Sequence, residues 1–554
     1  MAAASAAKSE SACPASGRGE PAERPRWRWL EVLAICVLFA LYAGQAPPAV
    51  NEAHYWTKAR HAWDPTWCDR DLFLASSDAH FVFTRLFGWL AAVCPLPLAV
   101  WIARTMAWFA LAVGWQRLSF AVVARPGLSI LTAMLWLAIV DWGTMAGEWV
   151  VGGVEAKCFA YAAVCLGLAD VQRQRWNRGL VWFGVATAMH VLVGGWALVA
   201  AGAAWLACGV YRPPLRSLAL GLVAAVLCAL PGLVPALALT RGVDREVVAE
   251  SAWIYVYGRL SHHLVFHRLE LTHIVRHVAW VGVWIAVGMA TPCRLSRSHL
   301  DQRPLRGFVG GAICLSICGA LIDQLLLGRW ELSASLLRYY WFRTSDAWLP
   351  AGAALAIIAA AVRWRDLHPR LARTMLGAAT LFASVNLYLG AEEHGVLAPS
   401  GIDPQWQTLQ RLEMLRGDQL PGLRGEWESI CGWIRTHTPS DSLWITPRNQ
   451  QTFKWFAERA EVVNVKDIPQ DAASVVAWQW RREAVFPPET SFAGLSGLGE
   501  TRLVELAQTY GADYILVDEW QGRRVLKLPV VYPPADQPTW FRIYAIPSAG
   551  QNTP

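Results

Sequence analysis

The chain has 554 residues, of which 55% are hydrophobic and only 16% are charged. A soluble domain carries about 25% charged residues, so this composition excludes a soluble multidomain protein as well as a disordered or fibrous one. The net charge of +7 does not indicate nucleic-acid binding, because the basic residues form short groups between apolar stretches, and the 32 Trp residues are typical of a polytopic membrane protein.

Residues 1–28 are rich in Ala, Ser, Pro and charge and have no apolar period, which predicts a disordered cytoplasmic tail. Eleven apolar stretches then follow, most of them near the length of a membrane span. They cover 29–46, 97–116, 127–145, 155–170, 179–193, 195–211, 216–239, 274–291, 307–327, 347–363 and 371–389. We interpret 29–46 as an uncleaved span, because Pro47 follows the only small-residue cleavage position.

The basic loops predict the topology of these spans. A twelfth apolar stretch, 81–95, would put the basic cluster 173–178 outside if it crossed the membrane, so we interpret it as an interfacial or re-entrant helix. The dense basic loops then all lie inside: 1–28, 117–125, 173–178, 212–216, 294–306 and 363–373. This arrangement predicts an inner (cytoplasmic) membrane protein with its N-terminus in the cytoplasm. The transmembrane domain, 29–390, would present four outer segments: 47–96, 146–154, 240–273 and 328–346.

Residues 391–554 contain no span and alternate helical and strand patterns. The expected helices are 424–437, 450–459, 472–485 and 501–510, and the expected strands are 442–446, 461–465, 513–518 and 540–546. Such alternation predicts an extracytoplasmic α/β domain with a parallel or mixed sheet. Neither a GxGxxG turn nor a GxxxxGK loop occurs, so the sequence does not favour nucleotide binding.

The first outer segment begins with Asn51-Glu52 and continues to His54. An acid a few residues after a membrane exit can act as a general base at the lipid surface. The alternative is a solvated loop whose aromatic residues anchor it at the interface.

Glu155 and Lys157 begin a span, and charged groups at membrane depth are costly and usually face a cavity or a partner. They predict a polar cavity at the outer face, although a helix-start acid and a snorkelling lysine would explain them equally well. His190 lies at the outer end of another span, either in that cavity or as a structural group.

The third outer segment carries Arg259, His262, His263 and His267. Such residues can donate hydrogen bonds to a phosphate, or His263 and His267 could share a helix face and bind Zn²⁺ with a carboxylate. An interfacial loop without a ligand is the third reading. A divalent metal is therefore conceivable, but we predict neither a metal site nor any other cofactor.

In the fourth segment, Arg343 among aromatic residues suits a phosphate head group, and it also suits an ordinary aromatic belt. Arg343 and Asp346 are three residues apart and could pair on a helix.

The layout of 29–200 resembles the C-type glycosyltransferases, the GT-C fold. That family places an acidic pair directly after the first span, where this chain has Asn51-Glu52. The family also has an Arg near the start of the second span, which matches Arg104, and an acid in the second outer loop, which matches Glu148 or Glu155. Asn51 stands where the family commonly has an acid, which leaves Glu52 to act alone.

More of the chain, 27–546, resembles an uncharacterised family of large bacterial membrane proteins that carry a domain of unknown function. The motifs that carry this resemblance are Gly-Gly-Val-Glu-Ala-Lys at 152–157, Met-His-Val-Leu-Val-Gly-Gly-Trp at 189–196, Arg-Leu-Ser-His-His-Leu at 259–264, Trp-Ile-Arg at 433–435, Thr-Pro at 446–447 and Tyr-Gly-Ala-Asp-Tyr at 510–514.

The GT-C resemblance implies a cell-envelope glycosyltransferase that uses a polyprenyl-phosphate-linked sugar at the outer membrane face. Its partners would be the lipid-linked sugar and membrane lipid. Glu52 would be the catalytic residue, with Asn51 and Glu155 beside it. The substrate-binding residues would be His54, Lys157, His190, Arg259, His262, His263 and Arg343.

Two other classes of protein stay open at this stage. A non-enzymatic transporter or lipid flippase would need a polar path across the membrane. An envelope scaffold would need an exposed patch on the C-terminal domain, for which the candidates are Trp427, Trp433, Trp455, Trp478 and Trp480. The sequence does not determine the oligomeric state.

Overall fold

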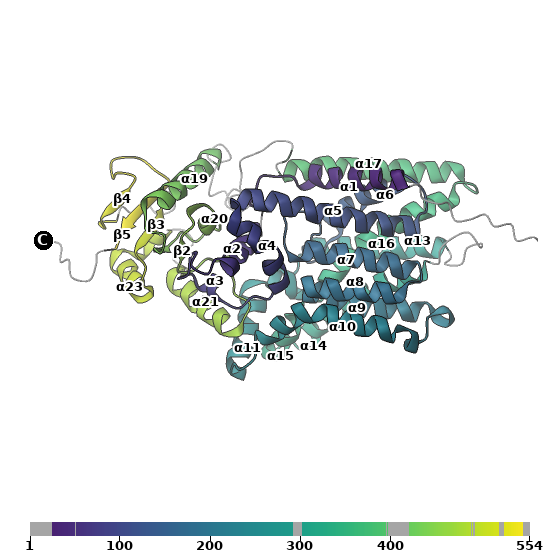
Figure 1. Cartoon of the computed structure of the whole chain (residues 1–554), viewed down its shortest axis with the longest axis horizontal. Coiled ribbons are helices and arrows are strands. Elements are labelled where there is room, and N and C mark those ends of the chain that lie inside the picture. Colours follow the sequence, from purple (N-terminus) through teal and green to yellow (C-terminus); the bar gives the residue numbers. More distant parts are fainter. Residues whose placement is uncertain are drawn as a thin grey trace, which may run out of the picture.

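The computed structural model describes residues 25–49, 51–291, 302–394, 396, 420–488, 490, 494–519 and 526–546. Long helices lie side by side in one bundle, and a small α/β domain lies at one end of it (Figure 1). Residues 1–24 of the predicted tail lie outside the described residues. The tail prediction is wrong for residues 25–28, which form the first turn of a helix that begins at Pro25, a residue favoured at the first helical position.

Each of the eleven predicted spans falls on a helix. These helices are α1 (Pro25–Ala43), α5 (Leu96–Val122), α6 (Leu128–Gly143), α7 (Ala156–Gln172), α8 (Trp176–Met189), α9 (Val191–Ala207), α10 (Leu215–Ala238), α13 (Leu271–Ala290), α14 (Arg303–Leu325), α16 (Arg343–Trp364) and α17 (Pro369–Glu393). Six of them, α5, α10, α13, α14, α16 and α17, are long and apolar enough to cross a membrane, and α6 and α9 are shorter apolar helices.

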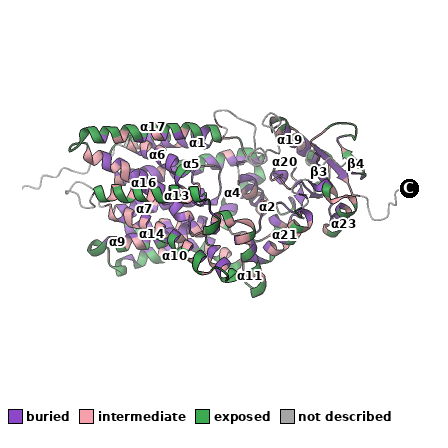
Figure 2. Ribbon diagram, turned by 180° about the vertical axis from the view of Figure 1, so that it is seen from behind, coloured by how far each residue is buried: buried purple, intermediate pink, exposed green. Residues whose placement is uncertain are grey.

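Exposed residues line the outward faces of the bundle helices (Figure 2), and many of these residues are large and apolar. On α10, Leu220 and Leu237 are 79% and 67% exposed, and on α13 Met289 is 74% exposed. Contiguous apolar surface of this kind is rare on soluble proteins and suits contact with lipid tails. A membrane location therefore fits the described helices.

Small residues bring the bundle helices into close contact. A Cβ added at Gly184 of α8 would lie 2.3 Å from the carbonyl oxygen of Ala225, and one at Gly232 of α10 would lie 2.3 Å from that of Ala188. Membrane helices associate through such small-residue contacts because lipid provides no hydrophobic drive between them. Larger side chains at these two positions would push α8 and α10 apart.

Short helices cover the domain end of the bundle. They are α2 (Glu52–Trp63), α3 (Leu72–Ala75), α4 (Phe81–Val93), α11 (Arg245–Trp253), η2 (Ile254–Arg259), α12 (Ser261–Leu264), η3 (Phe266–Arg268) and α15 (Trp330–Leu337). The short turn η1 (Gly209–Tyr211) instead lies in the loop that joins α9 to α10. Helix α4 covers most of the apolar stretch 81–95, which we interpreted as an interfacial or re-entrant helix. It packs mainly against α2 and lies with it between the bundle and the α/β domain (Figure 1).

The C-terminal domain is built on a five-stranded sheet with the order β2-β1-β3-β5-β4. The strands are β1 (Leu443–Ile445), β2 (Ala460–Glu461), β3 (Tyr514–Asp518), β4 (Val530–Tyr532) and β5 (Phe541–Ala545). β2, β1 and β3 are parallel, whereas β5 runs antiparallel to β3 and to β4. The sheet is therefore mixed, one of the two arrangements that the sequence predicted.

Helices cover both faces of this sheet, and alternate strand residues point to opposite sides. The helices of the domain are α19 (Leu420–His437), α20 (Phe453–Ala457), α21 (Ala472–Val485), η4 (Leu495–Leu498) and α23 (Glu500–Tyr510). Trp444 packs with residues of α19 and α20, whereas Leu443 and Ile445 pack with residues of α21 and α23. The predicted helix 450–459 and strand 461–465 are shorter than expected, and the sequence missed β4 because its three residues precede a Pro-rich turn.

The α/β domain shares its core with the outer segments. Trp67, Phe73, Leu74 and Ile254 pack into the same buried cluster as the strand residues of the domain. Polar contacts reinforce this, since the guanidinium of Arg60 pairs with Glu458 at 2.9 Å. The domain is thereby held against the outer end of the bundle.

Candidate functional site

A cavity of about 380 Å³ lies where the outer segments meet the α/β domain. Nine of the ten predicted site residues line it: Asn51, His54, Glu155, Lys157, His190, Arg259, His262, His263 and Arg343. The wall also includes residues that the sequence analysis did not single out as ligands: Tyr55, Glu148, Tyr255, Tyr340, Lys466 and Gln470. Four separate outer segments and the C-terminal domain therefore converge on one polar cavity.

Glu52 is the predicted site residue that does not line this cavity. Its carboxylate is 1% exposed and accepts two hydrogen bonds from Arg104, at 2.6 and 2.5 Å. It also accepts the backbone N–H groups of Ala49 at 2.7 Å and Val154 at 2.8 Å. This corrects the expected position of Glu52: the buried guanidinium of Arg104 lies directly against it, so the carboxylate binds two loops together behind the cavity wall.

One side of the cavity holds a network of charges that neutralise one another. Glu148 accepts a hydrogen bond from Arg343 at 2.8 Å and lies 3.2 Å from the amine of Lys157. Lys157 also pairs with Glu155 at 3.0 Å, and the Asn51 amide reaches Glu155 at 3.5 Å. Burial raises the pKa of Glu148, but Arg343 and Lys157 outweigh burial and hold that pKa below its ordinary value. This network therefore consists of two ionised carboxylates between two cations.

Asp346 positions the loop that carries Glu148. Its carboxylate accepts the backbone N–H groups of Met145 at 2.7 Å, Ala146 at 2.8 Å and Glu148 at 3.3 Å. The pairing of Arg343 with Asp346 that their spacing suggested is not observed. The guanidinium is bound to Glu148 instead, because the loop fills the hydrogen-bonding positions of Asp346.

The other side of the cavity is cationic. Arg259 donates from Nε to the carbonyl oxygen of Val465 at 3.1 Å, and Lys466 follows directly in the chain. In the described parts of the chain, neither Arg259 nor Lys466 forms an ion pair with a carboxylate. Burial and the nearby Arg259 lower the pKa of Lys466 to about 8, which reflects two cations held close together. Such a pair is suited to binding an anion.

The histidines on this wall are held neutral. His263 donates from Nδ1 to the carbonyl oxygen of Ala146 at 2.6 Å, and burial together with His262 lowers the His263 pKa to about 4. His190 accepts a hydrogen bond at Nε2 from Arg343 at 3.2 Å. These rings add hydrogen-bonding groups to the cavity without adding charge.

A histidine metal site is not found in the described residues. His263 and His267 do not share a helix face, because α12 ends at Leu264 and His267 pairs with Asp323 at 2.9 Å. No group of three or more His, Cys, Asp or Glu residues in the described ranges is placed to hold a metal ion.

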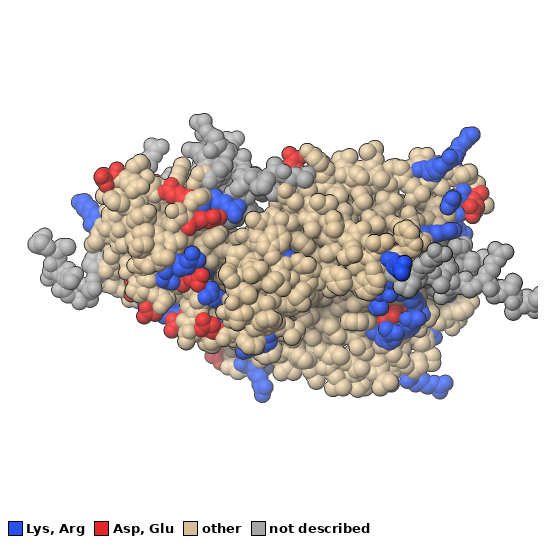
Figure 3. All heavy atoms as spheres, turned by 45° about the horizontal axis from the view of Figure 1, so that its top comes forward, with Lys and Arg blue, Asp and Glu red and all other residues tan. Residues whose placement is uncertain are grey.

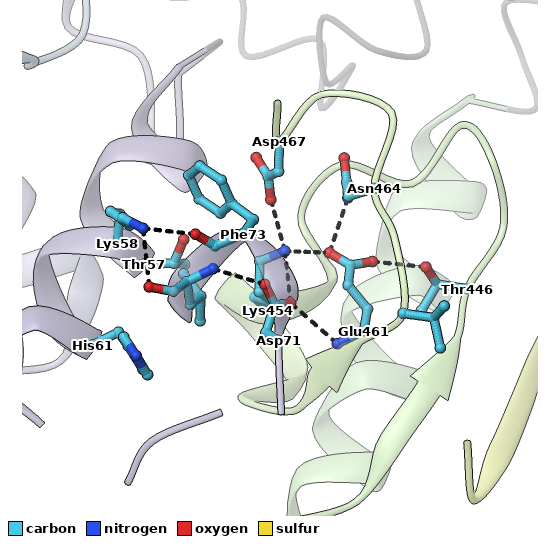
Figure 4. A network of polar contacts seen from close by, with 12 residues as sticks. Thr57, Lys58, His61, Asp71, Phe73, Thr446, Lys454, Glu461, Asn464 and Asp467 are labelled. Carbon is cyan, nitrogen blue, oxygen red and sulfur yellow. Dashed lines mark hydrogen bonds and ion pairs between the residues drawn. The ribbon is translucent and has the colours of Figure 1, made fainter. Parts of the chain in front are cut away.

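A buried cluster connects the cavity wall to the domain; we call Lys454, Asp71, Glu461 and Asp467 the Lys454 cluster (Figure 4). The amine of Lys454 lies 2.7 Å from both Glu461 and Asp467 and 3.2 Å from Asp71. Burial lowers the Lys454 pKa, but the three carboxylates outweigh it and raise that pKa above its ordinary value. Asp467 also contacts Nδ1 of His54 at 2.9 Å, so the cluster reaches the cavity.

A second cavity of about 410 Å³ lies between α2, α4 and the outer end of α10, and Lys58, Asp78 and Thr84 line it. A much smaller cavity, of about 10 Å³, is lined by these same three residues and by His54 and Tyr55 of the first cavity. The two large cavities are thus separated by a narrow constriction, which shares lining residues with both of them.

The sequence analysis missed Lys466 because the chain gives only a weak signal of its position. It lies in a loop after β2, roughly 200 residues from the histidines it faces, and only docking of the domain brings it to them. Its one sequence signal is a Lys-Asp pair directly after a predicted strand.

These features define a helical protein with candidate membrane spans and a C-terminal α/β domain that closes a charged cavity at one end of the bundle. Residues 425–485 match the family model described as a domain of unknown function, DUF6798. The match includes Lys454, Glu461, Lys466 and Asp467, and therefore both the Lys454 cluster and part of the cavity wall. No curated protein matches the sequence.

Proposed function

We propose that the protein is an integral membrane glycosyltransferase of GT-C type, which transfers a sugar from a polyprenyl-phosphate donor at the outer membrane face. The observation that carries this proposal is the cationic wall of Arg259 and Lys466, which faces a cavity at the outer end of an apolar bundle. A polyprenyl-phosphate donor matches this arrangement, because its phosphate needs cationic partners while its long apolar tail stays in the lipid.

The cavity provides the interactions that such a transfer needs. When the bond between the anomeric carbon and the phosphate oxygen breaks, negative charge grows on the phosphate. Fixed cations in a partly dry site stabilise that charge without reorganisation. Arg259 and Lys466 would hold the phosphate, whereas the network of Glu148, Lys157 and Arg343 would orient sugar hydroxyls.

Glu52 has a different role in this proposal from the one the resemblance implies. Its carboxylate is saturated by Arg104 and by backbone N–H groups, so a proton transfer to it would break a buried ion pair. We assign Glu52 to positioning the loop at 152–154 and α2. Glu155 and Asn51 remain in the cavity wall beside the reacting groups.

The proposal includes a topology of eleven spans, with the N-terminus in the cytoplasm and the α/β domain outside. It is supported by the eleven bundle helices and by the basic side chains at the end of the bundle opposite the domain (Figure 3). Basic loops are retained on the cytoplasmic side. This distribution supports our proposal that this end of the bundle lies in the cytoplasm and that the membrane is the inner one.

The two other functional classes have less support. A transporter or flippase would use polar groups across the membrane, but Arg104 is paired with Glu52 and Asp323 with His267, each near an outer segment. An envelope scaffold would expose the five Trp candidates together, but Trp427, Trp455 and Trp478 are at most 4% exposed. Trp433 is half-buried, and Trp480 is 65% exposed.

The test is transfer by the purified full-length protein in lipid nanodiscs. A panel of radiolabelled polyprenyl-phosphate hexoses and pentoses is supplied with envelope glycans, and loss of label from the lipid is measured. We expect transfer from at least one donor, and its loss in Arg259→Gln. Arg70→Gln, at an exposed pair outside the cavity, is the matched control. Binding without turnover across the panel would instead support a lipid carrier.

A further inference from the structure

We infer that His54 is the general base of the proposed transfer and that Asp467 of the α/β domain positions it. This inference rests on the proposed function, and it concerns the proton that the acceptor hydroxyl must lose. The structure brings together a cavity-lining imidazole, a buried carboxylate and a buried lysine, from two parts of the chain that lie about 400 residues apart.

The contact of His54 with Asp467 sets the form of the imidazole. An ionised carboxylate only accepts hydrogen bonds, so Nδ1 of His54 donates to Asp467 at 2.9 Å. The other nitrogen, Nε2, then carries a lone pair. His54 lines the cavity, and no hydrogen bond to Nε2 occurs in the described ranges. A base oriented by a carboxylate is the arrangement that activates hydroxyl nucleophiles in other enzymes.

The carboxylate itself is held in place. Burial raises the pKa of Asp467, but Lys454 and His54 outweigh burial and hold it far below its usual range. The second oxygen of Asp467 lies 2.7 Å from the amine of Lys454. Asp467 is therefore fixed as an anion that can stabilise the imidazolium formed when His54 takes a proton.

Other acidic groups near the cavity are already occupied. Glu148 and Glu155 are paired with Lys157, and Glu52 is paired with Arg104. Using one of these carboxylates as a base would cost an ion pair in a partly dry site. His54 can accept a proton and keep its hydrogen bond to Asp467, which becomes an ion pair.

His54 also lies where two substrates could meet. It lines the main cavity and the constriction that separates this cavity from the second one. A donor phosphate held by Arg259 and Lys466 would occupy the main cavity. An acceptor hydroxyl reaching the constriction from the second cavity would come within range of the imidazole.

The step balances as follows. The acceptor oxygen gives its proton to Nε2 of His54 and forms a bond to the anomeric carbon. The bond from that carbon to the phosphate oxygen breaks, and its electron pair stays on the polyprenyl phosphate. The imidazolium, paired with Asp467, later returns the proton to water or to the released phosphate.

The titratable groups around His54 come from several elements. Asp467 contacts it, Tyr55 packs against it, and His80 lies across the constriction, with its pKa lowered by burial. Lys58 lines the same constriction, and Lys454 lies behind Asp467. Of these, Asp467 alone forms an ion pair with the ring of His54 in the described ranges.

The experiment uses the full-length protein in nanodiscs with the radiolabelled donor panel. We expect His54→Gln to lower the transfer rate by about 100-fold or more, which is the usual contribution of a general base. Binding of polyprenyl phosphate should stay within about twofold, because the group that changes is not one of the cations that hold phosphate. Asp467→Asn should lower kcat by removing the anion that stabilises the imidazolium, and should leave polyprenyl-phosphate binding within about twofold.

A second measurement covers the case in which Asp467→Asn loosens the domain. Modification of His54 by diethyl pyrocarbonate, followed across pH by mass spectrometry, reports its neutral form without turnover. We expect Nε2 of His54 to be modified in wild-type protein, because Asp467 occupies only Nδ1. A transfer rate in His54→Gln equal to that of wild-type protein would overturn this inference and leave the proposed function standing. Absence of transfer from every donor by wild-type protein would overturn the proposed function as well.

Discussion

Two pairs of charged residues at the domain end of the bundle differ in whether the protein itself neutralises their charges. Glu52 and Arg104 are at most 1% exposed and form two short hydrogen bonds with each other. Arg259 and Lys466 lie in a cavity wall, both are cationic, and neither forms an ion pair with a carboxylate in the described ranges. The first pair is complete in the protein, whereas the second lacks the counter-ion that a ligand could supply.

The difference teaches that proximity to a membrane exit does not identify a reacting acid. One residue of each pair, Glu52 or Arg259, comes from an outer segment, and both pairs contain residue types that catalysis uses. What separates them is whether every hydrogen-bonding position is filled. Breaking a buried, filled pair costs folding free energy, whereas changing an open one costs ligand affinity.

The largest effect is expected for Glu52→Ala, which breaks the complete pair. It leaves the guanidinium of Arg104 buried without a counter-charge and should lower the free energy of unfolding by about 3 to 5 kcal/mol. Tryptophan fluorescence during thermal denaturation in nanodiscs measures this. The double variant Glu52→Leu with Arg104→Leu should recover much of the loss, because no unpaired charge remains. An unchanged melting temperature in Glu52→Ala would contradict the positioning role.

Lys454→Met should have a similar but more local effect on the α/β domain. Three carboxylates would lose their shared cation, at a cost of about 3 kcal/mol. Limited proteolysis should then release a fragment that contains the domain, while the bundle keeps its helicity. Asp441→Asn, at an exposed position of the same domain, is the control. Domain release by both variants would show that the Lys454 cluster is not specific to docking.

Lys466→Gln tests the open pair and should weaken polyprenyl-phosphate binding by about 10- to 100-fold, the value of one charge-assisted hydrogen bond. The folded protein has a Lys466 pKa of about 8, so wild-type affinity should fall as pH rises through that value and the amine loses its proton. Lys466→Arg keeps its charge above this pH and should remove the dependence. Equal affinities for wild-type and Lys466→Gln protein would exclude Lys466 from the anion site.

The smallest effect is expected for Arg70→Ala at the rim of the domain interface. Arg70 and Asp513 are 37% and 44% exposed, so solvent screens their pair and its loss should cost less than about 1 kcal/mol. Thermal denaturation should show a shift close to the experimental error. A shift as large as that of Glu52→Ala would mean that exposure does not separate the two kinds of pair.

The sequence predicted the helices of the bundle well, because each is an apolar run and a helix satisfies its own backbone locally. All eleven predicted spans fall on helices, and the main strands β1, β3 and β5 were expected near their observed positions. The sequence analysis missed β4 and predicted too long a helix for α20. Elements of three and five residues have too little periodicity of their own, and packing against the sheet decides them.

Candidate residues could be selected from the sequence because charged and imidazole side chains are costly beside apolar runs and stand out there. That reasoning selected Glu155, Lys157, Arg259 and Arg343, which do line one cavity. The same reasoning placed Glu52 in the cavity, which is wrong. The sequence does not show its burial against Arg104, because that burial depends on how α2 and α5 pack. The reasoning gave no role to Lys466 or Asp467, whose neighbours belong to distant segments.

The amino-acid sequence by itself determined which segments are apolar helices, which segments connect them and which charged residues those connections carry. These properties depend on local composition and period. Only the tertiary structure decided which charges neutralise one another and which stay open, and that His54 meets Asp467. The reason is physical: whether a charged group is satisfied depends on atoms within a few ångströms, and those atoms come from segments that only folding brings together.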